Sequence, residues 1–332
     1  MVRVGLIGFG LAGASFHAPL IACVEGMELA AIATSRPTDR FAGAVRHADS
    51  MALIDDDSLD LIVVATPNDS HAPLAQAALA AGRHVVVDKP LATDDGDAVA
   101  LVQLARGAGR LLSVFHNRRW DSDFLTVERL LRDDVLGDIQ LAEFRWDRFR
   151  PAIKPGWREE GGPGSGLLND LGPHMIDQAI RLFGMPDAVA GDVTTQRERA
   201  GVDDYFEVVL RYGARRVTIG SASLVAAPRP RFALHGTKGS FVKYGIDPQE
   251  AVLRAGGMPT DSGYGIEPDS LWGVLTDAEG ATRPVRSEAG DWRGFYRAMR
   301  DAIRGEGDAP VDPVDPVDAV RGLRIIEAAR AG

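Results

Sequence analysis

The chain of 332 residues is long enough for two domains of ordinary size, and an apolar content of 45% allows each of them a substantial core. A net charge of −10 argues against general binding to nucleic acids or acidic membranes, because such polyanions would be repelled. The single cysteine, Cys23, excludes an intrachain disulfide, and neither a signal peptide nor a membrane-spanning run is evident, so we expect a cytoplasmic protein.

Up to about residue 118, short apolar runs alternate with helical patterns. Strands are predicted at 2–7, 27–34, 59–66, 83–88 and 111–115, and helices at 70–81 and 94–108. A further helix should follow residue 10, and Pro19 should kink or shorten it. Continuous apolar strands that alternate with helices are typical of a doubly wound parallel sheet.

After Trp120 the pattern changes to alternating polar and apolar residues. Strands are predicted at 138–149, 188–196, 205–212, 216–224 and 231–236, and helices at 122–132 and 167–183. Alternation is typical of an antiparallel sheet with one solvated face. A last helix should begin at Pro316 with Asp315 as its N-cap. We therefore expect an α/β fold with a Rossmann domain over 1–120 and an α+β domain with a mostly antiparallel open sheet over 121–332.

A glycine-rich motif follows the first predicted strand and opens a helix. Its residues are Gly8, Phe9, Gly10, Leu11, Ala12 and Gly13. In the dinucleotide-binding fingerprint the first glycine permits a tight turn, the second lets the backbone approach a pyrophosphate, and the third lets helix and strand pack closely. The position of this motif predicts a dinucleotide site.

The end of the second predicted strand indicates which dinucleotide is bound. NAD sites place a carboxylate here, whereas this chain has Thr34, Ser35 and Arg36, with no carboxylate before Asp39. Ser35 and Arg36 can donate hydrogen bonds to a 2′-phosphate, so NADP is favoured. The alternative is that Arg36 is an ordinary surface arginine before a turn.

Polar residues also follow the next strand, at the carboxyl edge where open α/β sheets bind ligands. Thr66, Pro67, Asn68 and His71 are candidate cofactor contacts. Turn chemistry or helix capping is an alternative role for Asn68.

Asp88 and Lys89 end the strand at 83–88, and both are predicted to lie beside the cofactor. A lysine buried there can exchange protons, because burial lowers its pKa. The alternative is a surface lysine that leads a turn.

A second candidate for chemistry is the pair Asp170 and His174, which are four residues apart and so share one helix face. A histidine titrates near neutrality and suits the interconversion of an alcohol and a ketone, with a carboxylate fixing its tautomer. Two alternatives remain open: Asp170 caps the helix, or Asp170, His174 and Asp177 bind a metal. The second is disfavoured, since no further ligand cluster is evident, and we expect no metal.

Candidate substrate contacts lie in two other segments. His116, Arg119 and Trp120 follow the last Rossmann strand, where an inter-domain cluster of ion pairs is the alternative reading. Arg158 precedes the Gly-rich stretch 159–166, a candidate for a moving lid.

The segments GLIGFGLAG, ATPNDSH, HVVVDKP and NDLGPHMIDQ resemble, in order and spacing, the glucose–fructose oxidoreductase and inositol dehydrogenase (Gfo/Idh/MocA) family. FHAPLI, ATSR, LSVFHNRRWDSDFLT, WREEGGPGSG and FVKYGIDPQE are similar to its subgroup of NADP-dependent scyllo-inositol dehydrogenases. The resemblance implies catalytic roles for Lys89, Asp170 and His174, and assembly into dimers or tetramers through the C-terminal sheet. The chain departs from the family pattern at Asp88, where glutamate is commoner.

These observations together predict reversible hydride transfer between NADP and a ring carbon of a cyclitol or sugar, with scyllo-inositol as the leading substrate. In this prediction His174 moves the hydroxyl proton, and Lys89 and Asp170 orient and polarise the substrate. It requires the imidazole to face the coenzyme beside Lys89. The alternatives are a redox-neutral hydrolase or lyase that regenerates its dinucleotide, and a non-catalytic NADP sensor.

Overall fold

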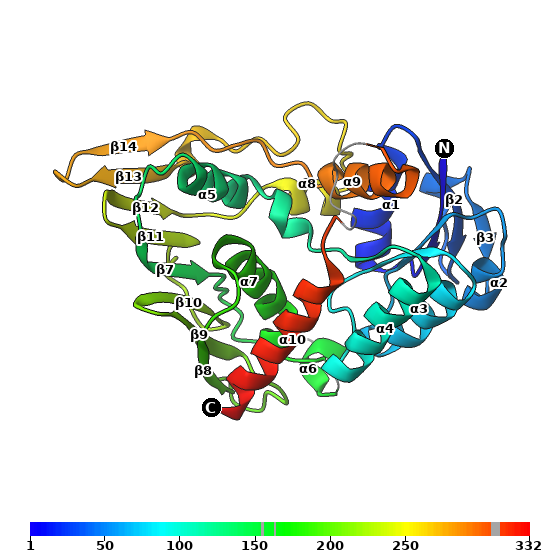
Figure 1. Cartoon of the computed structure of the whole chain (residues 1–332), viewed down its shortest axis with the longest axis horizontal. Coiled ribbons are helices and arrows are strands. Elements are labelled where there is room, and N and C mark those ends of the chain that lie inside the picture. The colour runs from blue at the N-terminus through cyan, green and yellow to red at the C-terminus, as the bar shows by residue number, and fades with distance from the viewer. Residues whose placement is uncertain (154–155, 163, 307–312) are drawn as a thin grey trace. The chain divides into compact units, whose positions relative to one another are not determined.

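A computed structural model describes residues 1–153, 156–162, 164–306 and 313–332 (Figure 1). The chain forms two units, each built from separate stretches of sequence. Unit 1 comprises Met1–Trp120, Pro248–Tyr264 and Asp291–Val320, and unit 2 comprises Asp121–Asp247, Gly265–Gly290 and Arg321–Gly332. These units differ from the contiguous division into 1–120 and 121–332 expected from the sequence, because two later segments pack with the first 120 residues.

Unit 1 contains a six-stranded parallel sheet in the order β3-β2-β1-β4-β5-β6. Its strands are β1 (Val2–Ile7), β2 (Met27–Ala33), β3 (Val45–His47), β4 (Leu61–Val64), β5 (His84–Val87) and β6 (Leu112–Val114). The strand order reverses between β1 and β4, and the crevice at such a reversal is where doubly wound sheets bind ligands. The predicted strands are confirmed, the first with the same bounds and the others with slightly shorter ones, and β3 is an addition.

Helical segments cover this sheet. They are a π-helix (Gly13–His17), α1 (Ala18–Ala22), α2 (Ser50–Ile54), α3 (His71–Ala80), α4 (Asp95–Ala108), α8 (Gln249–Arg254), α9 (Arg293–Arg304) and short 3-10 turns at Asp39–Phe41, Asn68–Ser70 and Asn117–Trp120. Helices α3 and α4 lie together (Figure 1). The apolar face of α9 enters the core formed by β1, β4 and α1 through Phe295, Tyr296 and Met299. Burial of that face explains why a late segment of the chain belongs to unit 1.

The helix after the glycine motif is irregular, as Pro19 predicts. A π turn over Gly13–His17, in which the Ala18 N–H donates to the Gly13 carbonyl, precedes α1, and Pro19 lies in the first turn of α1. Proline lacks an N–H and is tolerated in a first turn, so restarting the helix at Ala18 avoids the clash that an unbroken helix would impose. His17, at the end of the π turn, is fully buried.

Unit 2 is built on an eight-stranded sheet in the order β14-β13-β12-β11-β7-β10-β9-β8. Its elements are α5 (Ser122–Arg132), β7 (Ile139–Arg145), α6 (Trp157–Glu160), α7 (Leu167–Phe183), β8 (Ala188–Thr194), β9 (Tyr205–Tyr212), β10 (Arg215–Ala222), β11 (Phe232–Gly236), β12 (Gly239–Lys243), a 3-10 turn (Asp269–Leu271), β13 (Gly273–Asp277) and β14 (Thr282–Val285). Neighbouring strands are antiparallel except β7 and β10, which are parallel. The mostly antiparallel sheet expected from the sequence is confirmed.

Helices cover one face of this sheet. Apolar residues of α5, α7 and the later part of α10 (Pro316–Ala331) join β7, β9, β10 and β11 in one core (Figure 1). Asp315 accepts a hydrogen bond from the Val317 N–H at 2.9 Å, as predicted for the N-cap of α10. Strands β12–β14 were not predicted. A fully buried ion pair between Lys243 and Glu267, at 3.0 Å, joins the end of β12 to the segment that leads into β13.

Among the residues that the structure describes, no helix is long and apolar enough to cross a membrane.

Candidate functional site

The glycine motif of unit 1 has the local geometry that a dinucleotide requires. Gly8 has a φ of +95°, and a Cβ there would lie 2.4 Å from the Ala65 carbonyl oxygen. A Cβ on Gly13 would lie 2.1 Å from the Gly8 oxygen, so only glycine lets helix and strand approach this closely. A Cβ on Gly10, in contrast, would meet no atom within 4 Å. Packing therefore explains Gly8 and Gly13, whereas Gly10 leaves open space beside the backbone.

Phe9 and Leu11 of this motif differ in exposure. Phe9 is 9% exposed and packs edge-on against Phe41, with ring centroids 6.1 Å apart, whereas Leu11 is 47% exposed. Leu11 is thus accessible to a bound molecule, while Phe9 mainly anchors the turn.

The segment after β2 carries exposed polar and basic side chains. Ser35 and Arg36 are exposed, and the Arg36 N–H donates to Thr34 Oγ1 at 3.0 Å. Arg46 of β3, which we did not predict, donates to the carbonyl oxygens of Thr34 at 3.2 Å and Ser35 at 3.3 Å. Two arginines therefore follow or adjoin this strand end, and the described loop between β2 and β3 has its first carboxylate at Asp39.

His71 contacts two backbone carbonyl groups. Its Nδ1 lies 2.7 Å from the Pro90 oxygen and its Nε2 lies 3.0 Å from the Thr66 oxygen, and the residue is 1% exposed. Both ring nitrogens contact backbone carbonyls, so His71 bridges the segments that follow β4 and β5, and its expected contact with the cofactor stays a prediction. At the same edge Asn68 is buried at 9% exposure, and Thr66 Oγ1 accepts a hydrogen bond from Ser70 Oγ at 2.7 Å.

Asp88 and Lys89 lie at the end of β5, as predicted. Asp88 Oδ1 accepts a hydrogen bond from the Lys89 N–H at 2.8 Å, and Asp88 Oδ2 lies 3.9 Å from His17 Nε2. Burial favours the neutral acid, but the His17 ring and the charge of Lys89 outweigh it and hold the pKa of Asp88 below its ordinary value. The end of β5 therefore carries an ionised carboxylate beside a half-buried lysine.

The segment after β6 is largely occupied by contacts within unit 1. Arg119 is 7% exposed and forms an ion pair of 3.1 Å with Asp318, and His116 is 4% exposed. Trp120 packs edge-on against Phe295 with ring centroids 5.8 Å apart. The ion pair of Arg119 with Asp318 joins two residues of unit 1. The substrate contact expected of Arg119 stays a prediction.

In unit 2, α7 carries the second predicted pair. Asp170 Oδ2 accepts a hydrogen bond from Arg148 Nη1 at 3.3 Å, and the ring of His174 lies 5.9 Å from that of Trp146, tilted by 34°. Asp170 and His174 are one turn apart on this helix. His174 is 8% exposed, whereas the Asp170 side chain is 23% exposed.

The alternative that Asp170 caps α7 is wrong. The helix begins at Leu167, and its first N–H groups donate to Asp203: Leu167 N to the Asp203 carbonyl at 2.9 Å and Leu168 N to Asp203 Oδ2 at 2.7 Å. The N-cap position is Gly166, and Asp203, from the segment before β9, accepts the hydrogen bonds of the first helical N–H groups in place of a cap side chain. The Asp170 carboxylate is left to interact with Arg148.

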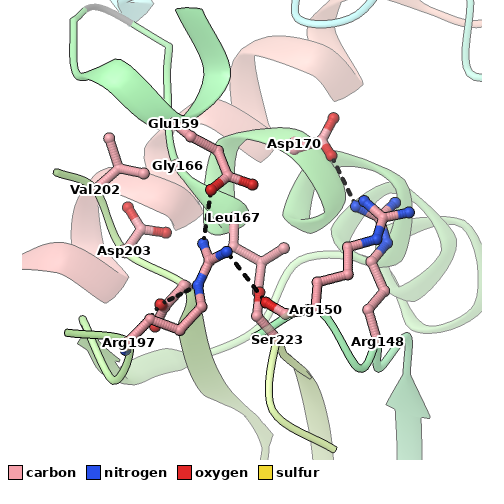
Figure 2. Close-up of a pocket in the computed structure, with 11 residues that line it drawn as sticks. Arg148, Arg150, Glu159, Gly166, Leu167, Asp170, Arg197, Val202, Asp203 and Ser223 are labelled. Carbon is pink, nitrogen blue, oxygen red and sulfur yellow. Dashed lines mark hydrogen bonds and ion pairs between the residues drawn. The ribbon is translucent and has the colours of Figure 1, made fainter. Parts of the chain in front are cut away.

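A pocket opens at the N-terminal end of α7 (Figure 2). Its lining is rich in charged side chains: Arg148, Arg150, Glu159, Asp170, Arg197, Asp203 and Asp204, with Gly166, Leu167, Val202 and Ser223. Figure 2 shows Arg197 pointing toward Glu159, and Arg148 toward Asp170. Such walls offer many hydrogen-bonding groups, which suits a hydroxylated ligand.

Arg197 and Asp204 hold one wall of this pocket together. Arg197 Nε donates to Asp204 Oδ2 at 2.7 Å, and the two side chains are 4% and 1% exposed. Burial by itself raises the pKa of Asp204, but hydrogen bonds from the Gln196 N–H and from Arg197 outweigh it, so this pKa is lowered. The folded state therefore favours the carboxylate.

We expect Asp204→Asn to lower the free energy of unfolding by about 1.5–3 kcal/mol at neutral pH, because it removes one of the two carboxylate partners of the buried Arg197 and leaves the ion pair with Glu159. Since the Asp204 pKa is lower in the folded state, this stabilisation is present above the ordinary pKa of about 3.9 and is lost as the pH falls through the folded value. Urea unfolding from pH 3 to 8 measures it. Asp192→Asn, a change at an exposed acid of β8, is the control, and equal losses in both variants would contradict the assignment.

Several residues described above were not predicted from the sequence. They are Arg46 in unit 1 and Trp146, Arg148, Arg197 and Asp204 in unit 2. The run RWDRFR at 145–150 was the available signal, since arginines repeated beyond a strand end need anionic partners. The side chain of Arg158 lies outside the described part of the chain, as does residue 163 of the proposed lid. Within the described residues no group of three His, Cys, Asp or Glu side chains could hold a metal ion.

Comparison with known proteins agrees with this architecture. The model of the GFO_IDH_MocA oxidoreductase family for an NAD-binding Rossmann fold matches residues 2–116, and its model for a C-terminal alpha/beta domain matches residues 128–331. The chain belongs to this family. Membership of this family makes the chain a dinucleotide-dependent oxidoreductase. The open space beside Gly10 is compatible with a dinucleotide at this turn.

Relatives of this family cover nearly the whole chain. The oxidoreductase YdgJ of Escherichia coli is 47% identical over 93% of this chain and 91% of its own length. The NADP-dependent scyllo-inositol 2-dehydrogenase IolW of Bacillus subtilis is 39% identical over 99% of this chain and 92% of its own length. Among solved structures, the oxidoreductase yvaA of Bacillus subtilis superimposes with a TM-score of 0.95 at 38% identity, covering 99% of this chain and 95% of that one.

Proposed function

We propose that this chain is an NADP-dependent dehydrogenase that interconverts a secondary alcohol and a ketone on a cyclitol or sugar, with scyllo-inositol as the leading substrate. The observation that carries the proposal is the arrangement on α7. There a carboxylate held by Arg148 and an imidazole packed on Trp146 project from one helix face beside a polar pocket. The similarity to a scyllo-inositol 2-dehydrogenase over nearly all of the chain supports the same class of substrate.

The proposed roles follow from the chemistry of each side chain. The coenzyme, when bound, supplies the hydride acceptor or donor. His174 takes the hydroxyl proton at an imidazole nitrogen, and the rigid packing of its ring against Trp146 limits the orientations that it adopts. Asp170 accepts hydrogen bonds from substrate hydroxyls, while Lys89 donates to the substrate oxygen and polarises it.

The decisive experiment is a screen of NADP⁺ and NAD⁺ reduction with scyllo-inositol, myo-inositol and a set of aldoses. We expect a net rise in nicotinamide absorbance with NADP⁺ and at least one cyclitol. Conversion of a glycoside without net absorbance change would favour a redox-neutral enzyme. Tight coenzyme binding without turnover of any polyol would favour a sensor.

Arg36 is proposed to determine the preference for NADP. We expect Arg36→Ala to weaken NADPH binding by about 10–100-fold, which corresponds to the loss of one charge-assisted hydrogen bond to the 2′-phosphate, and to leave NADH binding nearly unchanged. Fluorescence titration measures both affinities. Arg3→Ala is a matched control, because Arg3 pairs with Glu28 near the opposite ends of β1 and β2. A parallel loss of NADPH and NADH affinity in the Arg36 variant would contradict the assignment.

We further propose that the chain assembles into homodimers or homotetramers through the uncovered face of the unit 2 sheet. Leu141 of β7 and Val274 of β13 are 41% and 42% exposed, whereas the neighbouring Ala142 and Leu275 belong to the core. Apolar side chains on an open sheet face are typical of an interface. Light scattering of the wild type and of Leu141→Glu tests this, since a charge at the interface should dissociate the assembly.

A further inference from the structure

His17 is a buried polar residue to which the proposed reaction gives no role. It lies at the end of the π turn after the glycine motif and is 0% exposed. Its ring packs on Phe115 with centroids 4.3 Å apart. Its two nitrogens face different groups: Nδ1 lies 2.5 Å from the Tyr296 hydroxyl, and Nε2 lies 3.9 Å from Asp88 Oδ2.

Tyr296 is the hydrogen-bond partner of His17 Nδ1. The residue is 0% exposed on α9, and burial raises its pKa well above the ordinary value, so the hydroxyl keeps its proton. A protonated phenol at 2.5 Å from Nδ1 can donate to it or accept from it, and the Asp88 carboxylate on the other side of the ring favours donation, because it attracts an N–H at Nε2. In this arrangement the ring proton is on Nε2, the nitrogen that faces Asp88.

Asp88 connects this arrangement to the end of β5. One carboxylate oxygen faces His17, and the other accepts the Lys89 N–H at 2.8 Å. Four groups therefore follow one another from α9 through the π turn to the backbone of Lys89. All of them belong to unit 1.

We propose that Tyr296 and His17 are positioning residues: the Tyr296 hydroxyl fixes the tautomer of His17, the His17 Nε2–H orients the Asp88 carboxylate, and Asp88 holds the backbone of Lys89. Neither residue is proposed to touch substrate or coenzyme. The kinetic consequence rests on the proposed function, because it assumes that Lys89 acts on the substrate. The tautomer and its dependence on Tyr296 do not rest on it.

The first test is spectroscopic and needs no substrate. In ¹⁵N-histidine-labelled full-length protein, two-bond ¹H–¹⁵N correlations should show His17 as the Nε2–H tautomer. Tyr296→Phe removes only the hydroxyl and should give a mixture of tautomers or the Nδ1–H form. Tyr264→Phe is the matched control, since Tyr264 belongs to the same core and should leave the His17 signals unchanged. A wild-type Nδ1–H tautomer, or an unchanged tautomer in Tyr296→Phe, would overturn the proposal.

The second test measures kcat and NADPH affinity. A small displacement of a catalytic group costs up to about 100-fold in rate, so we expect Tyr296→Phe to lower kcat by about 10-fold. The NADPH dissociation constant should stay within about twofold, since the phosphate-binding glycines are untouched. His17→Phe should lower kcat at least as much, and adding Tyr296→Phe to it should change nothing further, because residues that act as a unit are not additive.

The two tests separate the failure of this inference from the failure of the proposed function. If the wild type turns over no polyol, the proposed function is wrong, and the spectroscopic test still decides whether Tyr296 fixes the tautomer. If the wild type is active and Tyr296→Phe keeps the full kcat, the positioning role is overturned. Independent, additive losses in the double variant would also overturn it.

Discussion

Replacement of His174 with alanine should lower the turnover of the proposed dehydrogenase by ~10²–10⁴-fold, the contribution typical of a general acid–base group. NADP(H) affinity should change little, because the glycine motif and the β2 end that are proposed to bind it lie in unit 1, whereas His174 lies in unit 2. Steady-state kinetics with the best substrate of the screen, together with NADPH titration, measures both quantities.

Two further variants control for lost packing around the ring, which is 8% exposed and lies against Trp146. His174→Gln keeps most of the volume and should be as inactive as the alanine variant. His235→Gln makes the same change in β11 of the same unit, where His235 contacts Ser240 at 2.8 Å, and should keep full activity. Turnover of His174→Gln comparable to that of the wild type would remove His174 from its proposed role.

Gly10→Ala should weaken NADPH binding by ~100-fold, equivalent to about 3 kcal/mol, while leaving the stability of the protein without coenzyme nearly unchanged. The physical reason is the open space beside Gly10: a new Cβ meets no protein atom within 4 Å, so any penalty arises against the bound pyrophosphate. Thermal unfolding without coenzyme and titration with NADPH separate the two effects.

Gly13→Ala is the matched comparison, because its Cβ would lie 2.1 Å from the Gly8 oxygen. This variant should be destabilised even without coenzyme, by about 1–3 kcal/mol or more. The Gly10 variant should thus lose NADPH affinity, whereas the Gly13 variant should lose stability. Wild-type NADPH affinity in Gly10→Ala would contradict the proposed contact between this backbone and the pyrophosphate.

Sequence patterns predicted helices and strands well where regular apolar spacing alone determines the element. The helix at Leu167–Phe183 and the strand at Tyr205–Tyr212 were predicted with the same bounds. In both segments the apolar residues keep a regular spacing that fits only one type of secondary structure. The strand at 138–149 ends instead at Arg145, since its last predicted residues include charged side chains that turn toward partners such as Asp170 and Arg229. Strands β12–β14 were missed, and β14 contains a proline that weakens its strand pattern.

Individual site residues likewise differ in whether their environment depends on nearby or on distant parts of the chain. The tight turn at Gly8 and the close packing at Gly13 follow from the motif alone, since backbone crowding is a local property. His71 and Arg119 were assigned to ligands, and within the chain they contact Pro90 and Asp318, which lie 19 and 199 residues further along. A polar side chain at a sheet edge has the same sequence pattern whether its partner is a ligand or a distant part of the protein.

The sequence by itself determined the alternation of strands and helices, the phosphate-binding turn, the absence of an early carboxylate after β2 and the helical spacing of Asp170 and His174. All of these depend on residues within a few positions of one another. Only the tertiary structure decided that α9 packs in unit 1, that Asp203 rather than Asp170 accepts hydrogen bonds from the first N–H groups of α7, and that Tyr296 lies against His17. Those contacts join residues that are far apart along the chain, and burial of apolar surface by the whole fold, rather than local preference, brings them together.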